Sequence, residues 1–429
     1  MNEYISYKKQ IKNYGHYDIV VIGGGPAGVC AAIEAARANK KVLLTESQAM
    51  TGGMATSALV GPFMTSYDRD GDAPTVGGIY REIVNRLLKI NGAVSPDETD
   101  APSIYTSFIE KYHKHVTPFN SFKLQLVLDE LLEESGAEVL LYTRFCDCIT
   151  ENGSIKYAVF SALEGLISVS ADIFIDCTGN ADTACAAGVH TYKGNEKDGI
   201  PQPGTLMFEV GNVDDSKYDK RPKYPVKAYK TPDKGVYTVN HYHVYNVDAA
   251  NSKSMTEAHI EARRQVVRAY KVLKEETPGF ENARILQVAS VLGVRESRHI
   301  DGVYKITVGD VAEGKKFDDR IAVYGFGMDI HSRQENCKSG NFKIQVAKRY
   351  YIPFSAMLPK GCENLIVAGK TISCESEAAG GLRCMPCAMA MGQAAGAAAA
   401  ISSEERKTPN KISVKKLQNI LIEHGAIID

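Results

Sequence analysis

Residues 17–46 read YDIVVIGGGPAGVCAAIEAARANKKVLLTE, and this stretch decides the fold. The apolar run at 19–22 predicts a buried strand, and the glycine-rich turn after it leads into an alanine-rich segment that predicts a helix. A second apolar run at 41–44 predicts another strand, which ends close to an acidic residue. Strand, glycine turn, helix and strand in this order are typical of a Rossmann-like, dinucleotide-binding α/β unit.

Each glycine of the turn suits a bound dinucleotide for its own reason. Gly23 permits the tight turn, Gly25 lets the backbone approach a pyrophosphate, and Gly28 lets the helix pack closely on the strand. Glu46 follows roughly 20 residues later, where a carboxylate accepts hydrogen bonds from both hydroxyls of a ribose. The unpaired N–H groups at the start of the helix suit the phosphates. The predicted contacts therefore also include Pro26, Ala27 and Ser47.

The glycine pattern alone does not separate NAD from FAD, and the segment after Glu46 favours FAD. Two consecutive glycines followed by small residues suit a loop under the ribityl chain and ring of a flavin; an ordinary glycine turn is the alternative. An NAD domain would usually continue here into another helix and strand. The residues concerned are Gly52, Gly53, Met54 and Ala55.

Two distant segments also favour a flavin. Residues 171–177 form an apolar run that predicts a strand, and it ends in Thr178 and Gly179. Residues 364–368 predict another buried strand, which ends in Gly369 and leads toward an Ala-rich helix at 386–401. These three terminal residues, together with Phe145, complete the predicted cofactor contacts on the strands.

Several motifs together resemble a known family. The GGGPAG turn, the GGMAT loop, the strand ending DCTGNAD and the C-terminal NLIVAGKTISC…EAAGGLRCMPCAMAMGQAAG are similar to FAD-dependent oxidoreductases of the glutathione-reductase-like superfamily. The sequence resembles the branch that includes fumarate reductase and p-hydroxybenzoate hydroxylase, and the resemblance covers about residues 17–401. It implies an α/β fold, a Rossmann-like FAD-binding domain with an inserted α+β substrate or cap domain. It also implies FAD and redox chemistry, and it names no substrate. Covalent members of the superfamily attach the flavin through a histidine after the double glycine, and no histidine occurs at 54–57, so we expect noncovalent FAD.

Composition divides the chain into three parts. Residues 1–184 are the first part of the predicted FAD-binding domain, with a mostly helical excursion at 60–124. Residues 185–347 are the predicted substrate or cap domain, with a long helix at about 256–276 and strands around 303–311 and 320–325. Residues 348–429 complete the FAD-binding domain. The middle part has no second GxGxxG motif, so we expect it to shape a substrate cavity rather than to bind nicotinamide tightly.

Bulk properties narrow the classes of partner. The formal net charge of the 429-residue chain is −1, which argues against nucleic acid and against an acidic membrane surface. Residues 1–16 lack the apolar core of a secretory signal, and the apolar run 387–401 is too short for a membrane span. Ten scattered cysteines indicate free thiols in a reducing cytoplasm. We expect a small-molecule substrate and no metal; whether the chain forms a homo-oligomer stays open.

The C-terminal helix supplies candidates for contacts with the flavin. By the resemblance, the backbone N–H groups from Pro386 to Met389 would face the pyrimidine edge and stabilise negative charge on the reduced flavin. Arg383, one turn earlier, would add a fixed positive charge there, or would instead pair with Glu377. The nearby Cys384 and Cys387 would form either a dithiol relay, aided by the helix N-terminus, or a packing pair; we favour packing.

The catalytic candidates are Arg295, His331 and Arg383. Residues 293–299 carry charges at a period of two, so Arg295, Ser297 and His299 would share one face of a strand. Arg295 would bind a substrate carboxylate in a bidentate manner, or would join a salt-bridge lattice between the domains. His331, in an Asp-Ile-His triplet that matches a family motif, would transfer a proton beside flavin N5, with a purely structural role as the alternative.

Three classes of function follow. The favoured one is an FAD-dependent oxidoreductase that transfers hydride between a small molecule and flavin N5. A non-redox or biosynthetic flavoprotein of the same fold, thiazole-synthase-like or tRNA-modifying, is the second. A binding protein that has lost catalysis on this fold is the third, and the intact glycines and Glu46 argue against it. His241 and His243, which alternate on a predicted strand, would face the cavity, but no third metal ligand accompanies them.

Overall fold

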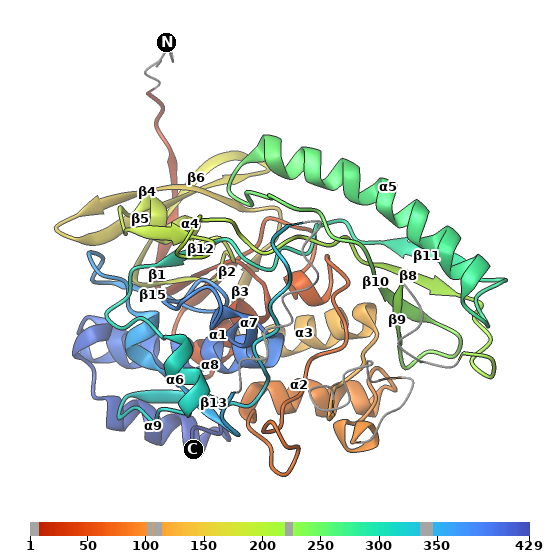
Figure 1. The fold of residues 1–429 in the computed structure, drawn as a ribbon. Helices are drawn as coiled ribbons and strands as arrows, with labels where there is room; N and C mark the ends of the chain where they lie inside the picture. The colour runs from red at the N-terminus through yellow and green to blue at the C-terminus, as the bar shows by residue number, and fades with distance from the viewer. Residues whose placement is uncertain (1–7, 101–104, 106–113, 219–225, 335–345) are drawn as a thin grey trace.

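A sheet of seven strands lies at the centre of the molecule (Figure 1). The structure is a computed structural model, and it describes residues 8–100, 105, 114–218, 226–334 and 346–429. The strand order is β3-β2-β1-β6-β5-β4, and β15 also pairs with β6. The strands are β1 Lys12–Ile22, β2 Val42–Thr45, β3 Glu138–Leu140, β4 Arg144–Glu151, β5 Ser154–Ala162, β6 Gly165–Asp176 and β15 Leu365–Val367.

The parallel part of this sheet confirms the Rossmann-like prediction. β1 pairs in parallel with both β2 and β6, and β15 adds a further parallel strand to the end of β6. Helix α1 (Pro26–Arg37) connects β1 to β2, as the glycine turn predicts, and packs against the C-terminal helix α8 (Met385–Glu405). The carboxyl ends of β1, β6 and β15 therefore meet at one edge of the sheet, where α/β folds bind their ligands.

A second sheet and the long helix α5 form a separate layer at one side of the molecule (Figure 1). The strand order is β11-β8-β10-β9, and every pair is antiparallel. Its hydrophobic core draws on residues between 206 and 294 together with Leu59, and α5 contributes its buried face. The bounds are β8 Phe208–Gly211, β9 Lys227–Lys230, β10 Tyr237–Asn240, α5 Ser252–Glu276 and β11 Arg284–Val288.

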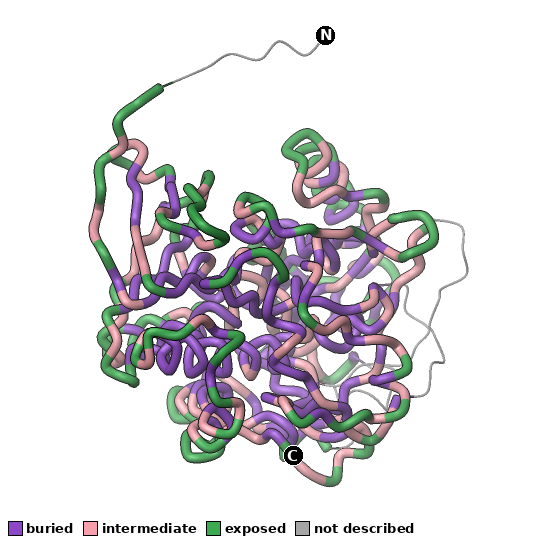
Figure 2. Tube along the Cα trace, turned by 90° about the vertical axis from the view of Figure 1, so that its left-hand side faces the viewer, coloured by how far each residue is buried: buried purple, intermediate pink, exposed green. Residues whose placement is uncertain are grey.

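Smaller elements complete the fold around these two layers. Two antiparallel pairs, β7 with β12 and β13 with β14, lie outside the main sheets. Figure 2 shows buried chain concentrated in the middle of the molecule and exposed chain around it. The bounds are α2 Gly78–Lys89, α3 Ser121–Ser135, α4 Asp182–Ala186, β7 Thr191–Lys193, β12 Arg298–Ile300, α6 Val308–Glu313, β13 Arg320–Tyr324, β14 Tyr350–Pro353, α7 Ala379–Leu382 and α9 Val414–Glu423.

Four sequence predictions about local structure are wrong, and one of them is the strand at His241 and His243, because β10 ends at Asn240. Residues 60–124, where described, are mostly loop, with helix only in α2, in the start of α3 and in a short turn. Residues 303–311 are no strand, because Thr307 and Asp310 form a capping box that starts α6. Residues 293–297 are irregular, and the predicted strand there is limited to β12. The strand predicted around 320–325 is confirmed as β13.

The predicted domain limits at 184/185 and 347/348 stay a prediction. Residues from Ile306 to Ile330, in the segment assigned to the cap, pack into the same hydrophobic core as α1 and α8. Among the described residues, no helix is both long and apolar enough to cross a membrane.

Candidate functional site

A cavity of about 890 Å³ lies at the carboxyl ends of β1, β6 and β15. This volume lies in the range of cofactor and ligand pockets. Most of the predicted cofactor contacts line it, although they come from segments that are far apart in the sequence. These residues are Gly23, Gly25, Pro26, Ala27, Glu46, Ser47, Gly53, Met54, Phe145, Thr178, Gly179, Gly369 and Arg383.

The three glycines of the turn have different surroundings. A Cβ on Gly23, whose φ is +100°, would lie 2.5 Å from the carbonyl oxygen of Cys177. A Cβ on Gly28 would lie only 1.8 Å from the carbonyl oxygen of Gly23, so this residue sets the close packing of α1 on β1. A Cβ on Gly25 would meet nothing within 4 Å, and Gly25 lines the cavity. The protein itself therefore requires Gly23 and Gly28, whereas a ligand would require Gly25.

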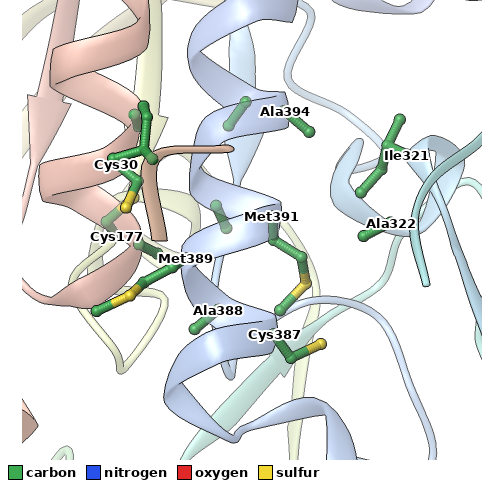
Figure 3. Close-up of a cluster of buried hydrophobic side chains, with 14 of the residues drawn as sticks. Cys30, Cys177, Ile321, Ala322, Cys387, Ala388, Met389, Met391 and Ala394 are labelled. Atoms are coloured by element: carbon green, nitrogen blue, oxygen red, sulfur yellow. The ribbon is translucent and has the colours of Figure 1, made fainter. Parts of the chain in front are cut away.

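The other predicted cofactor contacts lie beside the cavity rather than in its lining: Gly28, Gly52, Ala55, Pro386 and Met389. Gly52 takes a left-handed conformation (φ +92°) at the start of the Gly53–Ala55 turn. Because α8 begins at Met385, positions 385 and 388 share the face toward the cavity, and both line it. Met389 points instead toward Cys30 and Cys177 in the core between α1 and α8 (Figure 3).

Glu46 is buried and binds the loops on both sides of it. Its Oε2 accepts a hydrogen bond from the Gly24 N–H at 2.8 Å, and its Oε1 accepts from the Gln48 N–H at 2.8 Å and from the Ser47 hydroxyl at 3.0 Å. A carboxylate offers about four acceptor positions. Glu46 therefore both fixes the glycine turn and keeps acceptor capacity toward the cavity that it lines.

Replacing Glu46 with alanine should weaken FAD binding at least tenfold, because hydrogen bonds to a charged group contribute about 1.5–3 kcal/mol each. Equilibrium titration of the apoprotein with FAD, followed by flavin fluorescence, measures this. Glu164→Ala, at an exposed turn residue, is the control and should bind FAD like wild type. An unchanged dissociation constant for Glu46→Ala would place the adenosine ribose elsewhere.

Lys370 lines the cavity, and the sequence analysis did not include it. Its Nζ donates a hydrogen bond to the Val294 carbonyl at 2.8 Å, and its Cε would lie 3.5 Å from a Cβ on Gly179. Burial, and then the positive charge of Arg383, lower the pKa of Lys370 to about 8. In the sequence, Lys370 could have been recognised as a cavity residue by its position directly after Gly369, at the end of a buried strand. No ion pair to a described residue neutralises this lysine, so its charge suits an anionic cofactor.

The affinity for FAD should therefore fall as the pH rises above about 8, because Lys370 then loses the proton that a bound anion stabilises. Lys370→Met should bind FAD roughly tenfold more weakly at pH 7 and should lose this pH dependence, since a shift of one pKa unit corresponds to a factor of ten. Titrations between pH 6.5 and 9.5 test both statements, with the exposed Lys360→Met as control. A flat profile in wild type would remove Lys370 from the cofactor site.

Arg383 joins the cofactor cavity to a second group of polar residues. Its Nη2 donates to the Asp329 carbonyl at 2.8 Å and to the Asp329 carboxylate at 3.0 Å, and the side chain lines the cavity. Its Nε is buried and has no hydrogen-bond partner among the described residues. The alternative pairing with Glu377 is wrong, because Glu377 pairs with Arg333 at 3.3 Å.

His331 lies beside Asp329, with its Nε2 3.3 Å from the carboxylate. Burial lowers the pKa of His331 to about 4, assisted by the charge of Arg295 and opposed by Asp329. Burial alone would raise the pKa of Asp329, but its contacts with His331 and the positive charges of Arg383 and Arg295 hold that pKa well below its usual range. His331 is therefore neutral at pH 7 beside an ionised carboxylate. It does not line the cofactor cavity itself, and Arg383 connects the two.

Arg295 and His299 have different environments, contrary to the predicted shared strand face. The Nη1 of Arg295 donates to the Pro203 carbonyl at 2.7 Å and to the Thr205 hydroxyl at 2.9 Å. His299 is buried next to Glu296, at 3.8 Å. Glu296 also faces Arg333 at 3.6 Å and receives a hydrogen bond from Ser376. The salt-bridge lattice thus exists, but it is built on Glu296, and Arg295 is no part of it.

The cysteine pair has the environment of packing residues. Burial raises the pKa of Cys384 to about 12 and holds the pKa of Cys387 well above its usual value, so the helix N-terminus does not activate either thiol. Figure 3 shows Cys387 on the side of α8 away from Cys30 and Cys177. All nine cysteines in the described part of the chain are free, and Cys337 lies outside it.

His241 and His243 do not alternate on a strand, because β10 ends at Asn240. His241 uses its Nε2 for the Leu206 carbonyl at 2.6 Å, and burial lowers its pKa to about 4. The ring of His243 lies edge-on to the ring of His331, with the centroids 4.8 Å apart. No group of three or more potential metal ligands occurs within the described ranges.

Comparison with known proteins shows the family of this chain. The profile of the family described as "FAD dependent oxidoreductase" matches residues 18–421. The chain belongs to this family. Digeranylgeranylglycerophospholipid reductase of Methanoculleus marisnigri is 28% identical to this FAD dependent oxidoreductase over 179 residues, 41% of the chain and 42% of that reductase. Thiamine thiazole synthase of Aeropyrum pernix is 28% identical over 188 residues, 41% of the chain and 58% of that enzyme.

A solved structure agrees in fold. The flavin-dependent brominase Bmp2 superposes with a TM-score of 0.51 at 13% identity, over 94% of this oxidoreductase and 84% of the brominase. The FAD-binding Rossmann-like fold with a cap domain is therefore shared. The matched segments span less than two thirds of the length of the curated relatives.

Proposed function

We propose that this oxidoreductase holds FAD noncovalently in the cavity at the strand ends and transfers hydride between a small-molecule substrate and flavin N5. The observation that carries the proposal is Gly25, which lines the cavity with nothing within 4 Å of the place where a Cβ would lie. Such open space suits the pyrophosphate of a dinucleotide, and Glu46 lines the same cavity within reach of a ribose. When bound, the flavin would supply a two-electron acceptor or donor.

The donors and charges around the cavity fit an anionic dinucleotide. The N-terminus of α1 lies at the cavity, where Gly25 and Ala27 carry N–H groups that have no partner within the helix, on either side of Pro26. Lys370 and Arg383, which also line the cavity, add positive charge. The absence of a histidine from the Gly53–Ser57 segment favours noncovalent attachment, since related covalent flavoproteins use a histidine there.

His331 is the residue best suited to move a proton in this site. With its Nε2 directed at the ionised Asp329, the other ring nitrogen remains available as an acceptor. Because burial lowers its pKa to about 4, His331 is a neutral hydrogen-bond acceptor and a weak base at physiological pH. It would orient a substrate hydroxyl or amine, and it would accept the proton only as the departing hydride makes that proton acidic. The guanidinium of Arg383, held by Asp329, would stabilise negative charge that develops on the reduced cofactor.

Two experiments test the proposal. Purified protein should be yellow, and acid precipitation should release all the flavin into the supernatant. The anaerobic holoenzyme should then be bleached by at least one compound of a metabolite panel much faster than by NADH or NADPH. Colour retained in the pellet would contradict noncovalent binding, and fast saturable reduction by NAD(P)H would contradict a substrate-directed site. A flavin that keeps its oxidation state with every compound would favour the non-redox, thiazole-synthase-like alternative.

A further inference from the structure

A cluster of ionisable side chains lies where the second sheet meets the first core. We call it the junction cluster, and define it as Tyr229, His243, Arg295, Asp329, His331 and Arg383. Tyr229 belongs to β9 and His243 follows β10, whereas Asp329 and His331 follow β13 and Arg383 precedes α8. The side chains remain partly accessible: 44% of Asp329, 21% of His331 and 14% of Arg383 is exposed. The cluster is therefore recessed but open to a small ligand.

Direct contacts join the members of the cluster. Arg383 donates to the Asp329 carboxylate at 3.0 Å, and Asp329 lies 3.3 Å from His331. The His331 ring meets the His243 ring at a centroid distance of 4.8 Å. Arg295 is close enough for its charge to lower the pKa of both histidines, after burial as the larger cause. One end of this chain of contacts, Arg383, also lines the cofactor cavity.

The cluster carries an uncompensated positive charge at pH 7. Arg295 and Arg383 are cationic, and Asp329 supplies one negative charge. Burial lowers the pKa of His331 to about 4 and that of His243 to about 2, so both imidazoles are neutral. Burial also raises the pKa of Tyr229 to about 12, which keeps the phenol neutral. The cluster thus lacks one negative charge.

Arg295 is the member of the cluster that lacks a counter-ion. None of the described acidic side chains forms an ion pair with Arg295, although burial disfavours its charge and lowers its pKa to about 10. Three recessed cations nearby are paired: Arg383 with Asp329, Arg333 with Glu377, and His299 with Glu296. Lys370, which lines the cofactor cavity, has no ion pair to a described residue, and the proposed anionic cofactor would neutralise it. Arg295 is half-buried, and a charge that is withdrawn from water without an ion-pair partner loses part of its solvation. A ligand that brings one negative charge would compensate for this loss.

The geometry of Arg295 defines the kind of anion. Both of its hydrogen bonds to described residues, to Pro203 and Thr205, start from Nη1. The Nε and Nη2 atoms, which form the other edge of the guanidinium, donate no hydrogen bond to a described residue. Such an edge presents two parallel N–H groups, which match the two oxygens of a carboxylate. A phosphate dianion would overshoot the single missing charge.

We propose that the substrate is a monocarboxylate whose carboxylate group binds the Nε–Nη2 edge of Arg295, next to the neutral His331. This inference rests on the proposed function, because Arg383 links the cluster to the cofactor cavity. The carboxylate would anchor the substrate, and the carbon to be oxidised would lie between Arg295 and the flavin, within reach of His331. Arg295 is then a specificity-determining residue, and a neutral amide of the same shape is rejected.

The test uses the FAD-loaded protein and two matched pairs of probes, benzoate with benzamide and acetate with acetamide. Binding is followed by the difference spectrum of the flavin and by the thermal midpoint. At least one carboxylate should bind tenfold or more tightly than its amide and should raise the midpoint. Arg295→Gln should lose this preference, Arg295→Lys should keep part of it, and the exposed control Arg264→Gln should behave like wild type.

Different results overturn different statements. Equal binding of carboxylate and amide in wild type, or a preference that survives in Arg295→Gln, would overturn the role of Arg295. Loss of FAD from a folded Arg295→Gln would assign this residue to the cofactor instead, which also overturns the inference. A wild-type protein that binds no FAD would contradict the proposed function. In that case, the thermal midpoint of the protein with each of the four probes would still show whether Arg295 prefers a carboxylate to an amide.

Discussion

Replacing Gly25 with valine is expected to abolish measurable FAD binding, by a factor of roughly 100 or more, while the protein stays folded. A Cβ at this position meets nothing in the protein within 4 Å. The φ of −71° is one that every residue adopts without strain. The added side chain would instead occupy the space in which a pyrophosphate approaches the backbone. It would separate the phosphates from the N–H groups of α1, and a hundredfold loss equals about 2.7 kcal/mol.

The measurement combines an FAD titration with the thermal midpoint of the apoprotein. Gly309→Val is the control, since Gly309 is exposed, has no strained φ and has only the Thr307 hydroxyl within 4 Å. Both variants should melt within a few degrees of wild type, and only Gly25→Val should lose the flavin. Wild-type affinity in Gly25→Val would mean that the dinucleotide lies elsewhere, and the proposed function would lose its main support.

The sequence predicts well those elements whose conformation is determined by residues that are close in the sequence. The apolar run before Gly23, the glycine turn and the alanine-rich segment each have one favourable conformation. β1, α1 and β2 therefore follow from neighbours in the chain. The same holds for β6 and β15, whose buried runs end in small residues at the cavity. Most predicted cofactor contacts lie in the cavity for this reason.

The predictions that fail depended on contacts between distant segments or, in one case, on a local signal that was not recognised. Charges at a period of two suggested a strand at 293–299, but the buried pairing of Glu296 with His299 and Arg333 sets the backbone there. Thr307 and Asp310 form a capping box whose spacing was visible in the sequence and was not used. Arg383 offered two partners from sequence alone, and only the three-dimensional position of Asp329 separates them.

The spacing of Gly392 and Gly396 is a second signal that the sequence carried. These two glycines lie one turn apart in an alanine-rich helix, which suggests close contact with another helix but does not say which one. The partner is α1. A Cβ on Gly392 would lie 2.0 Å from the carbonyl oxygen of Ala27, and one on Gly396 would lie 2.4 Å from that of Ala31. The small residues thus hold α8 against the helix that begins the cofactor site.

Gly392→Val should therefore destabilise the protein by about 3 kcal/mol or more, which is at or beyond the usual upper range for overpacking. The atom in the way belongs to the backbone of α1, so no side-chain rotation relieves the clash, and α1 and α8 must separate. Because Ala27 also lines the cavity, the remaining folded protein should bind FAD more weakly as well.

Urea unfolding and an FAD titration of the same preparation measure the two effects. Ala390→Val, a half-buried position of α8, adds side-chain volume to the same helix and should cost less than about 1.5 kcal/mol, with FAD binding retained. Equal stability of the two variants would mean that α1 and α8 can move apart freely. The close packing of these helices would then have no part in positioning the glycine turn, and the two glycines would need another explanation.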